Sequence, residues 1–193
     1  MSDDIIIAQT KKWIIDVVVG CNFCPFAGKE VSRGSIHYEV LHAADKKKVL
    51  QALAIEFLYL DENPGTETSL LILPGSFLIF NEYLDLVEIA ESFLKKEGHE
   101  GKYQLASFHP LYLFAATTET DPANYTNRSP YPMLHLLREA SITKAVDNYP
   151  GIENIPLQNI DFTTKKGLNY MQSLKDACIN DPAFNIPEPP EYL

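Results

Sequence analysis

The sequence predicts a single α/β domain in which helices flank a small, mostly parallel sheet. Between residues 35 and 108, two long amphipathic segments separate short apolar or alternating runs. Helices of this length between strands act as crossover connections, which leave the strands parallel. After residue 129 the pattern is helical, so we also expect a helical C-terminal third. With 193 residues, the chain has the length of one domain with a sizeable core.

The N-terminal segment predicts a helix, a turn and a strand. Residues 5–19 have the spacing of an amphipathic helix, and Gly20 is a suitable end for it. A tight turn follows over residues 21–28. Residues 35–41 alternate between apolar and other side chains, which is typical of a strand. The apolar face of this strand contains Ile36, Tyr38 and Val40.

The middle of the chain predicts two more strands, each preceded by a helix. Asp45 is a candidate cap for a helix over about residues 46–60, and residues 68–73 form a short apolar run typical of a strand buried on both faces. A second long helix is expected over residues 76–96, followed by a strand over 103–108. Residues 111–116 predict a strand or an extended segment. If this segment pairs antiparallel, the sheet is mixed.

The C-terminal part is predicted to be helical. Ser129 and Pro130 have the properties of an N-cap and a first helical residue, for a helix that reaches Glu139. Further helices are expected over residues 141–149, 155–166 and 168–179. We therefore expect one domain over residues 1–180. The proline-rich tail, residues 181–193, is expected to be extended or disordered.

Composition excludes several classes of function. The formal net charge of −10 disfavours binding to nucleic acids and to anionic membrane surfaces. The acidic N-terminus does not resemble a signal peptide, and no run approaches the roughly 20 apolar residues needed to cross a bilayer. Three cysteines provide no disulfide framework, so we expect a cytoplasmic protein. Composition leaves the oligomeric state open.

An anion-binding site is predicted where the helix at Pro130 would begin. Helix N-termini present free N–H groups and a partial positive charge, and Arg128 stands beside this one. His135 and Arg138 would share a face of the same helix with Glu139. Either this face lines a pocket, with His135 as acid or base, or its charges pair with neighbours and water. The predicted ligand-binding residues are Asn127, Arg128, Ser129, Tyr131 and Arg138.

Cysteines and histidines provide further candidates for chemistry. Cys21 and Cys24 form a C-x-x-C motif, but a zinc site needs a second ligand pair and a thioredoxin-like site needs a preceding strand. Buried thiols are the simpler interpretation, although Cys24 next to Pro25 could cap a helical turn and ionise more easily. His109 follows a strand, at the edge of the sheet where ligands bind in open α/β folds. A histidine hydrogen-bonded to loop backbone is the alternative. His37, within a strand, has a weaker claim.

Three longer motifs complete the sequence. The first is Trp13 followed by Cys24-Pro25-Phe26-Ala27, and the second is Ser107-Phe108-His109-Pro110 with Tyr112 and Phe114. The third runs from Asn124 to Pro132 and continues into His135-Leu136-Leu137-Arg138-Glu139. In these motifs the chain resembles an uncharacterised bacterial family, domain of unknown function 1415, over about residues 10–178. The resemblance implies no known activity, substrate or cofactor. It favours Cys24 over Cys21, whose place typical members give to an apolar residue.

Three functional hypotheses follow. The leading one is a cytosolic enzyme that acts on a small anionic metabolite, a carboxylate or a phosphate, with Cys24, His109 and His135 as catalytic residues. The second is a non-catalytic module that binds the same kind of small anion. The third is a metal-binding protein that uses Cys24 and the two histidines. We also predict that Cys24, His109 and the loop 127–129 converge on one pocket.

Overall fold

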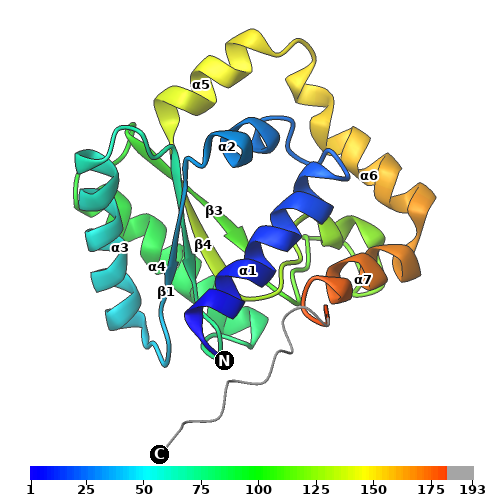
Figure 1. The fold of residues 1–193 in the computed structure, drawn as a ribbon, viewed down its shortest axis with the longest axis horizontal. Helices are drawn as coiled ribbons and strands as arrows, with labels where there is room; N and C mark the ends of the chain where they lie inside the picture. Colours follow the sequence, from blue (N-terminus) through cyan, green and yellow to red (C-terminus); the bar gives the residue numbers. More distant parts are fainter. Residues whose placement is uncertain (182–193) are drawn as a thin grey trace, which may run out of the picture.

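The computed structural model describes residues 1–181 and contains one open four-stranded sheet flanked by helices (Figure 1). Its strands lie in the order β1 (Ile36–Val40), β2 (Thr68–Ile72), β4 (Met133–Arg138) and β3 (Tyr103–Phe108). β1 and β2 are parallel, whereas β4 is antiparallel to both β2 and β3. Three strands therefore run in one direction and β4 runs against them. The predicted α/β class, with a mixed sheet, is confirmed.

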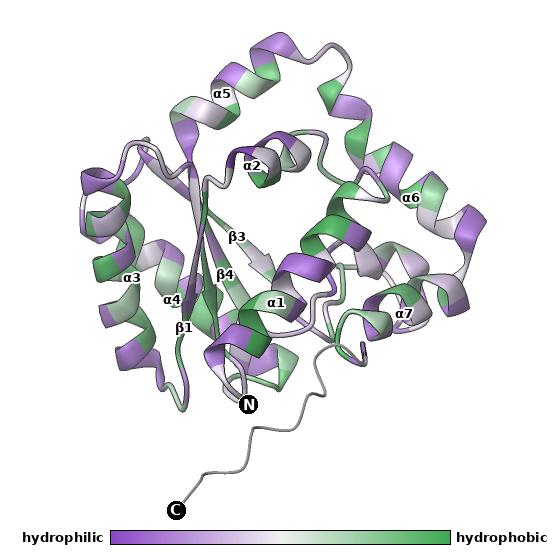
Figure 2. Cartoon of the chain, viewed as in Figure 1, coloured by the Kyte–Doolittle hydropathy of each residue, from purple (hydrophilic) through white to green (hydrophobic). Residues whose placement is uncertain are grey.

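Two long helices, α3 (Lys46–Glu62) and α4 (Phe80–Lys96), cover one face of the sheet. As predicted, Asp45 caps α3, because its carboxylate accepts a hydrogen bond of 2.8 Å from the Lys48 N–H. Figure 2 shows hydrophilic and hydrophobic residues alternating along α3, as an amphipathic helix requires. The core on this side contains Val49, Leu53, Phe57, Leu71, Leu86, Leu134 and Leu136.

The other face packs against α1 (Asp3–Trp13) and against α7 (Leu168–Ala177). The Trp13 ring lies edge-to-face on Phe108 with ring centroids 5.1 Å apart, and its indole N–H donates to the Arg128 carbonyl at 3.1 Å. The helix continues beyond Trp13 as a π-helix, η1 (Ile14–Val19). Gly20 ends η1 where a Cβ atom would lie 2.4 Å from the Asp16 carbonyl oxygen. Only glycine fits this close approach.

The helix expected at Ser129–Pro130 is wrong, and so is the strand alternative for residues 111–116. No helix begins at Ser129–Pro130, because residues Met133–Arg138 form the strand β4. Pairing on both sides gives β4 a complete ladder, and this tertiary pairing overrides the helix propensity of its leucines. Residues 111–116 form no strand; a turn begins there, with the Tyr112 N–H donating to the His109 carbonyl. A short 3-10 helix, η2 (Pro122–Thr126), follows this loop.

Helices dominate the C-terminal part, as predicted. α5 (Glu139–Asn148) leads through η3 (Ile152–Asn154) to α6 (Ile155–Lys166) and then to α7. α5 has no buried residue and lies at the top of Figure 1, beyond α2 (Ala27–Arg33). None of the helices in residues 1–181 has the length and apolar composition that crossing a bilayer requires. The predicted tail lies outside the described residues except for Asp181.

Candidate functional site

His109 is held inside the protein by both of its ring nitrogens. Its side chain is fully buried, Nδ1 accepts the Leu111 N–H at 3.0 Å and Nε2 lies 2.9 Å from the Phe77 carbonyl. Because a carbonyl only accepts, the proton is on Nε2 and the ring is neutral. Burial lowers the pKa of His109, and the rings of Phe80 and Tyr83 lie beside it. These contacts match the loop-backbone alternative; the catalytic role stays a prediction.

The hydrogen bonds of the Arg128 side chain also go to groups within the protein. The residue is 8% exposed, its Nε donates to the Tyr112 carbonyl at 3.0 Å and Nη2 donates to the Glu119 carbonyl at 3.0 Å. The guanidinium stacks on the Tyr125 ring, 4.8 Å from its centroid. It therefore fastens the loop over residues 112–119 to η2. The helix N-terminus that was expected to support its role in anion binding does not exist.

The neighbours of Arg128 in the third motif have internal partners as well. The Asn127 amide donates to the Ser107 carbonyl at 3.2 Å, and the buried Ser129 hydroxyl donates to the Tyr131 carbonyl at 2.5 Å. The Tyr131 hydroxyl donates to the Gln9 side chain. His109 and this segment lie side by side, because the His109 N–H donates to the Asn127 carbonyl at 3.2 Å.

His135 and Arg138 point to opposite faces of the sheet, because β4 is a strand and not a helix. Arg138 lies on the side of α3, where its Nε donates to the Thr66 carbonyl at 3.0 Å and its Nη2 donates to the Leu60 carbonyl at 2.5 Å. It ties the end of α3 to the sheet. The expectation that these two side chains share a helix face is therefore wrong.

His135 faces the side of α1 and contacts Thr68. Its Nε2 lies 2.5 Å from the Thr68 hydroxyl oxygen, and that hydroxyl is also 2.5 Å from the Leu136 carbonyl. The hydroxyl has one proton, which the carbonyl needs, so His135 Nε2 carries a proton and donates. Burial lowers the pKa of His135 to about 4. The ring is therefore neutral near pH 7, and a role as acid or base stays a prediction.

The three cysteines are free thiols in different surroundings. Cys178 is fully buried, and burial raises its pKa to about 11. Burial also raises the pKa of Cys21. Cys24 is half-buried in the turn before α2, with its carbonyl accepting the Ala27 N–H. Within residues 1–181, no hydrogen bond, ion pair or ring contact joins Cys24 to His109 or Arg128, so their convergence stays a prediction.

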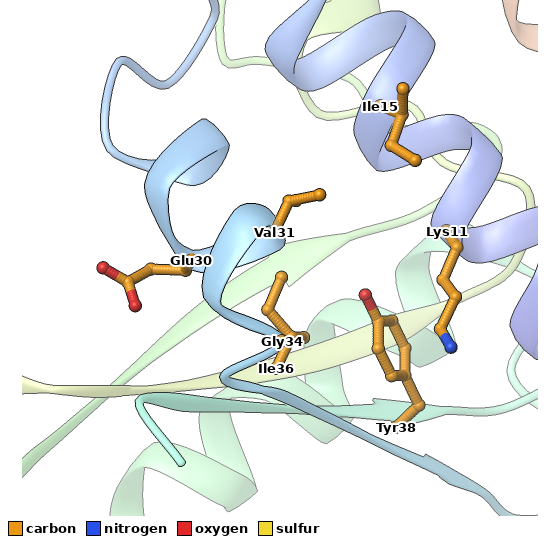
Figure 3. A pocket seen from close by; sticks show the side chains of 7 residues that line it. All are labelled: Lys11, Ile15, Glu30, Val31, Gly34, Ile36 and Tyr38. Atoms are coloured by element: carbon orange, nitrogen blue, oxygen red, sulfur yellow. The ribbon is translucent and has the colours of Figure 1, made fainter. Parts of the chain in front are cut away.

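A cavity that sequence reasoning missed lies between α1, η1, α2 and β1 (Figure 3). Its volume is about 240 Å³. The Lys11 ammonium lies 5.1 Å from the centre of the Tyr38 ring, and Figure 3 shows the Tyr38 hydroxyl directed between α1 and α2. Burial raises the pKa of Tyr38 to about 12, so its hydroxyl stays protonated. The lining residues are Lys11, Ile15, Glu30, Val31, Gly34, Ile36 and Tyr38.

The sequence predicts only part of the lining of this cavity. The alternation of β1 identifies Ile36 and Tyr38 as neighbours on one face, which the structure confirms. Nothing in the local pattern shows that Lys11 comes to lie over that face, because helix packing decides it. Metal-ligating side chains gather elsewhere in the described residues, at His37, Glu39 and Glu56. That group contains none of the cysteines or histidines of the metal-binding hypothesis.

Comparison with known proteins identifies a family and no function. The family model described as Protein of unknown function (DUF1415) matches residues 5–173. No curated protein and no solved structure matches the chain significantly. The matched region contains the whole sheet, both helices of its α3 side, and the segments of all three motifs. The chain belongs to the DUF1415 family of proteins of unknown function.

Proposed function

We propose that this protein binds a small organic monoanion with an apolar body, in the cavity between α1, α2 and β1. One observation supports the proposal most directly: the cavity combines apolar walls with an exposed lysine and a tyrosine hydroxyl that have no polar protein partner in residues 1–181. Lys11 forms no ion pair there, and the Tyr38 hydroxyl forms no hydrogen bond. Ligand sites commonly have this composition, with a few polar groups among apolar walls.

The chemistry of the lining favours a carboxylate over other ligands. A carboxylate oxygen could accept hydrogen bonds from the Lys11 ammonium and the Tyr38 hydroxyl together, and such charge-assisted bonds are the stronger kind. The walls that would contact a hydrocarbon chain or ring are Ile15, Val31 and Ile36. Ile15 is 50% exposed without a ligand, so covering it would contribute hydrophobic free energy.

The same lining limits the charge and the size of the ligand. The Glu30 carboxylate points away from Lys11 and Tyr38 in Figure 3 but belongs to the same cavity, so a second negative charge on the ligand would be repelled. Glu30 is held by the Ser35 hydroxyl at 2.6 Å. A volume of about 240 Å³ lies below the roughly 300–1,000 Å³ of pockets for drug-sized molecules. A short aliphatic or aromatic monocarboxylate satisfies both limits.

Binding without catalysis fits this cavity better than an enzyme does. Its lining contains no cysteine, serine, threonine or histidine, and Cys24, His109 and His135 are not among the lining residues. A cytoplasmic location suits the three free thiols, which a reducing compartment preserves. The net charge of −10 supports the absence of nucleic-acid partners.

Thermal unfolding with matched ligands tests the proposal. Hexanoate or benzoate at ten times its dissociation constant should stabilise the fold by about 1.4 kcal/mol, which raises Tm by roughly 3–6 °C in a chain of this size. Hexanamide, which lacks the charge, should have a much smaller effect. Lys11→Gln and Tyr38→Phe should each reduce the shift, and Lys47→Gln, which removes an exposed lysine of α3, should not. Equal shifts in Lys11→Gln and wild type would refute the site.

A further inference from the structure

We propose that His37, Glu39 and Glu56 form a binding site for one divalent metal ion, with Zn²⁺ as the best-fitting ion. His37 and Glu39 are two residues apart on β1, so both point to the α3 face of the sheet, and Glu56 reaches them from α3. One ligand atom of each residue lies within 4.8 Å of the other two. This site is on the side of β1 opposite the cavity and does not depend on the proposed function.

The distance between His37 and Glu56 is close to that between two ligands of one metal ion. His37 Nε2 lies 3.7 Å from a Glu56 carboxylate oxygen. Ligand atoms about 2.0–2.1 Å from a tetrahedral Zn²⁺ are about 3.3 Å from each other. Binding of the ion would therefore draw the three ligand atoms together from separations that reach at most 4.8 Å. Three protein ligands would leave one position of a tetrahedron open to water or to another small ligand.

Glu56 provides a second observation that points to a cation. It is 2% exposed, so its charged carboxylate has lost most of its hydration and needs a compensating partner. The Ser69 hydroxyl donates to the Glu56 carboxylate oxygen Oε2, which also lies 3.7 Å from His37 Nε2. A buried carboxylate directed at an imidazole and a second carboxylate is stabilised when a cation lies between them.

Neighbouring side chains hold the proposed ligands in orientation. The Ser69 hydroxyl fixes Glu56, and the His37 ring stacks on the Tyr59 ring with a centroid distance of 4.0 Å. Partners of this kind orient the ligands of many metal sites. One imidazole with two carboxylates suits Zn²⁺, whereas Mg²⁺ prefers oxygen ligands alone and retains its water. We therefore expect Zn²⁺ to bind and Mg²⁺ to bind poorly.

Calorimetry and X-ray absorption together test the proposal. In calorimetry, the tag-free full chain, dialysed against a chelator, should bind one Zn²⁺. The fine structure above the zinc X-ray absorption edge should show only nitrogen and oxygen neighbours. His37→Gln and Glu39→Gln should each weaken Zn²⁺ binding at least 10-fold. The control His42→Gln, which removes a nearby histidine paired with Asp3, should leave it unchanged. Circular dichroism establishes that each variant is folded.

Two results would overturn the proposal. Sulfur in the zinc coordination shell would place the ion on a cysteine, which Cys24→Ser would then confirm by loss of binding. The absence of a one-to-one calorimetric signal with wild type would leave His37 as a charge partner for the two glutamates and not as a metal ligand. The absorption spectrum is measured on the wild-type chain, so the proposal stays testable even if a variant fails to fold.

Discussion

Replacing Arg128 by alanine should destabilise the fold, although its sequence context suggests a surface residue for ligand binding. The guanidinium donates to two loop carbonyls at 3.0 Å each and stacks on Tyr125. Hydrogen bonds to a charged partner contribute about 1.5–3 kcal/mol, and a cation–π contact about 1 kcal/mol more. Because two carbonyls of the same loop are affected, these contributions overlap. We expect a loss of about 4 kcal/mol in the free energy of unfolding.

Urea denaturation followed by circular dichroism measures this loss of free energy. In thermal unfolding, the same loss should lower Tm by roughly 8–16 °C. Arg128→Lys keeps the charge but not the two-armed geometry, so it should lose about half as much. Arg33→Ala is the control, because that side chain is 55% exposed and reaches Glu30 only at 4.0 Å. Its loss should stay within about 0.5 kcal/mol. An Arg128→Ala protein as stable as Arg33→Ala would show that our structural role for Arg128 is wrong.

Three further predictions concern thiols, pH and backbone packing. In brief treatment with iodoacetamide, Cys24 should react faster than Cys178, which is fully buried and has a pKa of about 11; mass spectrometry of peptides measures both, and equal rates would contradict this. His135 has a pKa of about 4, below the roughly 6.5 of the unfolded chain, so the unfolded state binds more protons between these values. Stability should therefore decrease as pH falls from 6.5 to 4, by up to about 3 kcal/mol, and this decrease should be smaller in His135→Gln. Gly20→Ala should cost about 2 kcal/mol or more, measured by urea denaturation, because its Cβ would collide with the Asp16 carbonyl, whereas Gly65→Ala, with open space around it, should cost little.

Much of the fold could be predicted because local sequence and tertiary structure agree there. The strand over residues 103–108 has the predicted bounds, and α3 starts after the predicted cap at Asp45. In each case the apolar spacing matches the face that is buried. The extension of α1 as a π-helix over Ile14–Val19 was not predicted, since the same apolar residues suit an α-helix.

β4 shows where such agreement ends. Its six residues include three leucines and an arginine, which favour a helix, and Ser129–Pro130 provides a credible helix start. The strand forms because β2 and β3 each leave an edge that only this segment fills. β3 and β2 precede β4 by about 30 and 65 residues, so the local sequence of β4 does not reveal this pairing. The wrong secondary structure also makes the predicted site wrong. His135 and Arg138 would share a face in a helix, but they lie on opposite faces in a strand, where side chains alternate.

Buried polar residues explain most of the difference between the predicted and the observed sites. Arg128, Asn127 and Ser129 have the residue types and the clustering of a ligand site, yet each forms hydrogen bonds to backbone carbonyls. A loop such as 109–132 has many backbone groups without strand or helix partners, and polar side chains must satisfy them. Residue types alone do not distinguish a polar side chain that binds a ligand from one that forms hydrogen bonds to the backbone of its own loop.

The alternation of β1 links the two proposed sites. Ile36 and Tyr38 face the cavity, while His37 and Glu39 face Glu56, so a shift of one residue in register would exchange the two sets. β1 lies at the edge of the sheet and pairs only with β2, so few contacts fix its register. The Ser35 carbonyl accepts the Glu67 N–H at 2.8 Å at one end, and the Leu41 N–H donates to the Ile72 carbonyl at 2.9 Å at the other. Because these bonds hold both ends of β1, they position the proposed anion cavity and the proposed metal ligands together.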